Sequence, residues 1–230
     1  MKRPSVKRTY SLRSLVILIN LLVLALPVIS LLALRIFENI VHRQTEMKLT
    51  AEAAYVRSLY LDALAGALQE GSTTRQRLLM PVENSPHHAD DYWRPYPPRI
   101  DLTEDPVLPP GPESLKNTIP PHPAAIKAGK YIQPILKEAQ RISLSGIRVL
   151  DSRGVVVASS GSQLGENLKN RPEVQKALTG QYSSVLRSRE DAALEDLGPI
   201  SRASRVRTYV ALPILVDDKD VAGVAYLHRT

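Results

Sequence analysis

The sequence predicts an α+β protein. One transmembrane helix continues into a long helix, and an antiparallel sheet of about five strands with helices packed on it follows. Three observations predict this class. Residues 14–34 are uncharged and mostly apolar, residues 38–70 contain no proline and repeat apolar side chains every seven positions, and residues 146–227 alternate between apolar stretches and turn residues.

The apolar run at residues 14–34 predicts a membrane anchor. About twenty helical residues cover about 30 Å, the hydrocarbon thickness of a bilayer. A cleaved signal peptide is the alternative, but the run exceeds the usual apolar region of about 7–15 residues and no small-x-small cleavage site closes it. We therefore assign residues 14–37 to a transmembrane helix and residues 1–13 to a cytoplasmic tail.

The basic residues predict the orientation of this anchor. Five Lys or Arg and no acid lie in residues 1–13, whereas the three in residues 35–50 are interleaved with acids. The positive-inside rule then places the N-terminus in the cytoplasm and the rest outside, in a single-pass protein of the inner membrane with a periplasmic domain. Because much of the net charge of +7 flanks the membrane, we do not expect a nucleic-acid partner.

Residues 38–71 predict a membrane-proximal helix with two open interpretations. A seven-residue apolar repeat is typical of a coiled coil, so this helix could form a parallel homodimer along one seam. An amphipathic helix that packs on its own domain needs a similar stripe, so that alternative stays open. The predicted seam consists of Ile40, Met47, Ala54, Leu61 and Leu68.

Residues 72–123 predict a Pro-rich loop or linker, because they contain twelve of the 18 prolines. The run from His87 to Asp91 contains two His and two Asp, but adjacent histidines in a loop are poor chelates, so we expect a solvated loop and no metal site. The chain has no cysteine, which excludes disulfides and thiolate chemistry. No catalytic motif occurs, and no cofactor is expected.

Residues 124–230 predict the sheet and its helices. A helix at 124–145, with Pro134 as a possible break, precedes a hairpin of strands at 146–151 and 155–160. A short helix follows at 171–178, with Pro172 near its start and Gly180 just after its end. Further strands are expected at 182–189, 206–216 and 221–227. The simplest arrangement is a meander with the helices on one face.

Three motifs in this region resemble the extracytoplasmic PAS-like or Cache-type sensor domains of bacterial receptors. They are VLDSRGVVVASS (149–160), GENLKNRPEVQKALTGQY (165–182) and RTYVALPILVDDKDVAGVAYLHRT (207–230). With the upstream anchor, the layout is similar to the input region of two-component sensor histidine kinases. The resemblance implies a membrane-anchored extracytoplasmic sensor. Kinase activity and a partner response regulator are implied only if a kinase core follows this region. The alternative is a stand-alone binding or scaffold protein of the envelope.

The resemblance also implies a ligand site on the inner side of the sheet, under the segment that follows the short helix. Arginine forks suit carboxylate or phosphate groups, so we expect an anionic small molecule. Arginines on a solvated face, or against lipid headgroups, are the alternative. We expect replacement of Arg187 and Arg207 by Gln to abolish binding with little effect on stability. The predicted site residues are Tyr182, Arg187, Arg189, Arg207 and Tyr209.

Overall fold

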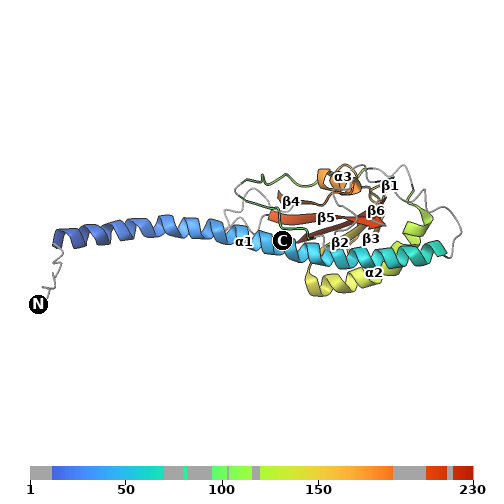
Figure 1. Cartoon of the computed structure of the whole chain (residues 1–230), viewed down its shortest axis with the longest axis horizontal. Coiled ribbons are helices and arrows are strands. Elements are labelled where there is room, and N and C mark those ends of the chain that lie inside the picture. Colours follow the sequence, from blue (N-terminus) through green and yellow to red (C-terminus); the bar gives the residue numbers. More distant parts are fainter. Residues whose placement is uncertain are drawn as a thin grey trace, which may run out of the picture.

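The computed structural model describes residues 12–69, 80–81, 95–102, 104–115, 120–188, 206–216 and 220–229. Its N-terminal helix, α1 (Leu12–Gln69), extends away from the rest of the structure over its first half and lies along the other helices and strands over its second half (Figure 1). The predicted α+β class, with a long N-terminal helix and an antiparallel sheet, is confirmed.

Helix α1 runs without interruption through the predicted membrane segment into the predicted membrane-proximal helix. Pro27 lies inside the helix and does not end it. The apolar side chains of its first half are exposed, whereas Leu49, Val56 and Tyr60 in its second half are buried. In the part of the chain that the structure describes, α1 is the one helix long and apolar enough to cross a membrane.

The sheet is antiparallel, and its last strand lies in the middle. Strands β5 and β6 are buried along almost their whole length, which requires cover on both faces and places them inside the sheet. The expected meander is therefore wrong, because β6 lies between β2 and β5. The order is β3 (Val156–Ser159), β2 (Gly146–Asp151), β6 (Asp220–Arg229), β5 (Val206–Val216) and β4 (Ser183–Ser188), with β1 (Met80–Pro81) also paired to β6.

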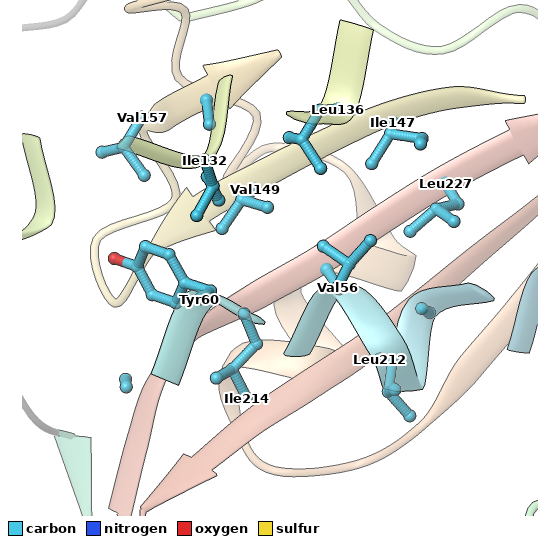
Figure 2. Close-up of a cluster of buried hydrophobic side chains, with 14 of the residues drawn as sticks. Val56, Tyr60, Ile132, Leu136, Ile147, Val149, Val157, Leu212, Ile214 and Leu227 are labelled. Atoms are coloured by element: carbon cyan, nitrogen blue, oxygen red, sulfur yellow. The ribbon is translucent and has the colours of Figure 1, made fainter. Parts of the chain in front are cut away.

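Helices α1 and α2 (Pro123–Ser143) cover one face of the sheet. Helix α2 begins with Pro123 after His122, whose Nδ1 accepts a hydrogen bond from the Ala124 N–H, and Pro134 lies inside α2 without breaking it. Alternate side chains of the strands meet both helices in the main core (Figure 2). Its members include Tyr60, Ile132, Leu136, Ile147, Val149, Leu212, Ile214 and Leu227.

Helix α3 (Pro172–Leu178) covers the opposite face, which appears above the sheet in Figure 1. The expectation that all helices pack on one face is therefore wrong. Val174 and Leu178 of α3 pack against Leu150, Tyr209 and Tyr226, which alternate along their strands with the residues of the main core. Both faces of the sheet are therefore covered. The hydrophobic core on the second face, here named the α3 face, is the smaller of the two.

Around Leu108, the Pro-rich segment runs along the outer edge of β4. Leu108 forms a parallel bridge with Arg187, and its N–H donates to the Leu186 carbonyl at 2.8 Å. The Leu108 carbonyl in turn accepts from the Ser188 N–H at 2.9 Å. This pairing satisfies an edge strand and brings the next residue, Pro109, close to the α3 face.

Candidate anion-binding site on the α3 face

Four arginines and a histidine gather on the α3 face at one end of the sheet. Arg148 lies on β2, opposite Tyr226 of β6. Arg207 lies on β5, opposite Arg187 of β4. Two further residues complete the group: Arg171, which precedes α3, and His228, which lies two positions after Tyr226 on β6. Five segments distant in sequence therefore place cationic or titratable side chains together.

One of these arginines is neutralised by a buried acid. The Arg187 guanidinium donates to both carboxylate oxygens of Glu173 on α3, at 3.2 and 2.8 Å, and both side chains are almost fully buried. Tyr226 adds its hydroxyl to the same carboxylate at 2.8 Å. Burial works to raise the pKa of Glu173, but the Arg187 hydrogen bonds prevail and hold that pKa below its usual value. This triad fixes α3 to β4 and β6.

Tyr226 forms the floor of the remaining group. Its ring stacks on Tyr209, with centroids 5.7 Å apart, and Tyr209 stacks in turn on His228 at 5.2 Å. The guanidinium groups of Arg148 and Arg171 lie 5.8 and 5.7 Å from the Tyr226 ring centre. These cation–π contacts hold both arginines over the sheet without neutralising their charge.

Arg148, Arg171 and Arg207, here named the arginine cluster, have buried nitrogens without a hydrogen-bond partner among the described residues. These nitrogens are one terminal nitrogen of Arg148 and the Nε atoms of Arg171 and Arg207. Nδ1 of His228 is also buried without a hydrogen-bond partner among the described residues. Among the nearby acids, Glu166 acts electrostatically on Arg148, and Glu173 is already paired with Arg187. The three arginines therefore carry more positive charge than the nearby acids offset. Buried donors and unneutralised charge together favour an anion at this place.

The electrostatic field of the arginine cluster acts strongly on His228. Burial lowers the pKa of His228 to about 3, and the guanidinium groups of Arg148, Arg207 and Arg171 act in the same direction. His228 is therefore neutral at physiological pH, and its ring supplies one donor and one acceptor. Gly146 allows this position, because a Cβ there would collide with the His228 ring.

The lowered pKa of His228 predicts a pH dependence of stability. The unfolded chain takes up this proton near pH 6.5, whereas the folded chain resists it down to about 3, so stability is lost as the pH falls through this window. We expect His228→Gln to remove a slope of up to about 1.4 kcal/mol per pH unit. Denaturant unfolding at a series of pH values measures it. Equal slopes in both proteins would contradict the assignment, since His42, whose pKa is also lowered, is present in each.

The five site residues predicted from the sequence divide between two faces. Arg207 and Tyr209 belong to the group on the α3 face, and Arg187 lies beside them in its ion pair. Arg189 lies outside the described residues. Arg187 is almost fully buried, so we now expect its replacement to be destabilising, because its loss leaves Glu173 buried without its counter-ion.

Tyr182 lies with the main core on the opposite face, where it contacts α1. Its hydroxyl donates to the Glu46 carboxylate at 2.8 Å and lies 3.0 Å from the Thr50 hydroxyl. The same carboxylate accepts from the Ser184 hydroxyl at 2.6 Å and from the backbone N–H groups of Arg99 and Ile100 at 3.0 Å. The fully buried Glu46 thus fastens α1 to the beginning of β4.

Sequence reasoning missed Arg148, Arg171, Glu173, Tyr226 and His228. Arg148 alternates with Leu150 and His228 with Tyr226, so each shares a face with an apolar neighbour, which was a usable signal. Strand order was the missing information, because the pairing of β2 with β6 places Arg148 beside Tyr226. The packing of α3 on the same face then adds Arg171 and Glu173.

The predicted dimer seam is divided between solvent and core. Ile40 and Met47 are 47% and 48% exposed and Ala54 is exposed, whereas Leu61 and Leu68 pack partly against the main core. The packing of α1 on its own domain uses other positions, such as Leu49, Ala53, Val56, Tyr60 and Leu64. The homodimer stays a prediction.

Within the described residues, no group of three or more His, Asp or Glu side chains is arranged to hold a metal ion. The histidines and aspartates of residues 87–91 lie outside the described residues. The guanidinium groups on the α3 face are suited to carboxylate or phosphate anions.

Comparisons with known proteins give a partial structural likeness. No family model and no curated protein matches the sequence. Among solved structures, the chain is similar to the crystal structure of the sensor domain of the V. cholerae histidine kinase DctB, with a TM-score of 0.34 and 20% identity. The match covers 44% of this chain and 37% of that one.

Proposed function

We propose that this chain is the membrane-anchored sensor region of a signal-transduction receptor and that it binds a small anionic molecule on the α3 face. The observation that supports this most directly is the arginine cluster, with its buried unpartnered nitrogens around the Tyr226 ring. A carboxylate or phosphate would receive charge-assisted hydrogen bonds there and offset the excess positive charge. Titration of thermal stability with small anions tests this binding.

The route from this site to the membrane supports a sensing role. Strands β4 and β5 carry Arg187 and Arg207 on the α3 face and contact α1 on the other. Ser184 of β4 binds Glu46, and the hydroxyl of Thr208 on β5 lies 3.3 Å from Nδ1 of His42. A ligand that moves these strands therefore acts on a helix that enters the membrane. Such a ligand would shift the populations of α1 arrangements.

The receptor class that we propose is a two-component sensor histidine kinase with a PAS-like or Cache-type input domain. The ordered motifs at 149–160, 165–182 and 207–230 support this through their resemblance to such domains. This proposal expects a second apolar span and a kinase core in the same receptor, with a response regulator as partner. A stand-alone binding protein would use the same anion site without signalling to a kinase.

We further propose that the N-terminus is cytoplasmic and the sheet extracytoplasmic, supported by the basic residues of the N-terminal tail. Since the chain has no cysteine, single cysteines can report the topology. We expect Ser114→Cys in intact cells to react with a membrane-impermeant thiol reagent and Ser5→Cys to react only after lysis. The reverse pattern would contradict this orientation.

We also propose that α1 pairs with α1 of a second copy, because two anchors in one membrane are parallel and the seam is exposed at Ile40, Met47 and Ala54. We expect Ala54→Cys to cross-link between copies faster than Tyr55→Cys, which is 79% exposed but about 100° further round the helix. A signalling role predicts that an anion bound on the α3 face changes the Ala54→Cys rate. Equal rates at both positions would exclude this seam.

A further inference from the structure

A groove lies where the apolar half of α1 meets the loop before Leu108. It has a volume of about 820 Å³, within the size range of small-molecule sites. One wall is α1 from Val28 to Glu38, and the other is formed by Leu102, residues 105–107 and Val206 at the start of β5. Both walls are mainly apolar, although Val107 remains 39% exposed.

The position of this groove along α1 puts it inside the membrane boundary. Arg35 is the first charged residue after the apolar run, and Val28 lies seven residues before it, which is about 10 Å along a helix. A headgroup layer is only about 5–8 Å thick on each side of the hydrocarbon. The end of the groove at Val28 therefore reaches the level of the acyl chains.

We infer that this groove binds a phospholipid of the leaflet on the domain's side of the membrane. An acyl chain lies between Val28, Leu31 and Leu32 of α1 and the apolar loop residues Leu102 and Val107. The occupant follows from continuity, because the α1 wall is the same surface that lipid covers on the rest of the span. This inference rests on the proposed membrane anchor.

The rim of the groove selects the headgroup. Arg35 supplies a cation for the phosphate, and Glu38 and Asp105 add two negative side chains to the same lining. A zwitterionic phosphatidylethanolamine presents a phosphate and an ammonium group and so matches both signs. An anionic phosphatidylglycerol would meet two acids and one base. The geometry therefore points to the ethanolamine lipid.

A tryptophan reporter in the full chain tests the acyl-chain contact. The only native tryptophan, Trp93, is replaced by Phe, and Val107→Trp is reconstituted into phosphatidylethanolamine and phosphatidylglycerol vesicles. Their acyl chains are brominated near the glycerol in one set and near the bilayer centre in a second set, so that Trp at either depth is within reach of bromine. We expect the bromine to quench most of the Val107→Trp emission. Tyr55→Trp, about 30 Å further along α1 from Arg35, should keep its emission. Leu22→Trp, within the span, serves as the positive control.

The controls separate failure of the groove from failure of the anchor. If Leu22→Trp is quenched and Val107→Trp is not, the anchor holds and the groove assignment is overturned. If neither is quenched, the anchor fails and the groove assignment falls with it.

Lipid retention tests the headgroup. After detergent extraction from vesicles with equal amounts of both lipids, we expect the wild-type chain to retain mainly phosphatidylethanolamine, measured by mass spectrometry. Arg35→Gln should weaken this retention roughly tenfold or more, as expected for a lost charge-assisted contact. Arg141→Gln, which changes an exposed arginine on α2, should behave as wild type. Equal retention of both headgroups in all three proteins would overturn the headgroup assignment.

Discussion

Glu173→Gln is expected to lower the free energy of unfolding by about 3–5 kcal/mol, because it leaves Arg187 buried without a counter-ion. The side chains of Arg187 and Glu173 are 4% and 0% exposed, so water cannot solvate the guanidinium that is left unpaired. Tyr226 also loses the carboxylate that accepts a hydrogen bond from its hydroxyl. Denaturant unfolding of the full chain in detergent measures the change.

Glu138→Gln is the matched control for this prediction. Glu138 pairs with Arg141 at 3.1 Å on α2, but their side chains are 65% and 78% exposed. The same substitution there should cost less than about 1 kcal/mol. A double variant, Glu173→Leu with Arg187→Met, should be more stable than Glu173→Gln alone, because it removes the unpaired charge. Equal losses from Glu173→Gln and Glu138→Gln would show that the pair does not stabilise the fold.

Glu46→Gln is expected to cost about 3 kcal/mol and to loosen α1 from the sheet. Its two carboxylate oxygens accept from the backbone N–H groups of Arg99 and Ile100 and from two hydroxyls. An amide replaces one of these acceptors with an NH₂ group, which must face a donor. The Ile100 N–H loses its acceptor in one orientation of the amide, and the Tyr182 and Ser184 hydroxyls lose theirs in the other.

Glu52→Gln provides the control on the same helix. Glu52 is half-buried, and its substitution should change stability by no more than about 0.5 kcal/mol. Hydrogen exchange measures the local effect, and we expect faster exchange in the second half of α1 for Glu46→Gln only. Unchanged exchange in α1 would mean that Glu46 does not fasten this helix to β4.

The elements of this fold could be predicted from local sequence patterns. The Ser152–Arg153–Gly154 turn predicts the β2–β3 hairpin, where Asp151 accepts hydrogen bonds from the N–H groups of Arg153 and Val155. Proline and glycine around residues 172–180 predict α3. These signals are local, because each depends on neighbours within a few residues.

The arrangement of these elements was not predictable by the same means. The position of β6 between β2 and β5 depends on its pairing with β2, whose partner residues lie 72 to 82 positions apart, and no local pattern records such a pairing. Two of the predicted site residues, Arg207 and Tyr209, lie together on the α3 face, because spacing by two fixes a shared face. Tyr182 was misplaced because it precedes β4 and points to the α1 face.

Anion titration of thermal stability tests the central claim most directly. The full chain is melted in the presence of inorganic phosphate and small mono- and dicarboxylates, alongside Arg148→Gln/Arg207→Gln and the exposed control Arg141→Gln. We predict that at least one anion stabilises the wild type and the control saturably, by about 2.7 kcal/mol at a hundred times its Kd, and leaves the double variant unchanged. Equal stabilisation of the double variant, or no stabilisation of the wild type by any anion, would contradict an anion site on the α3 face.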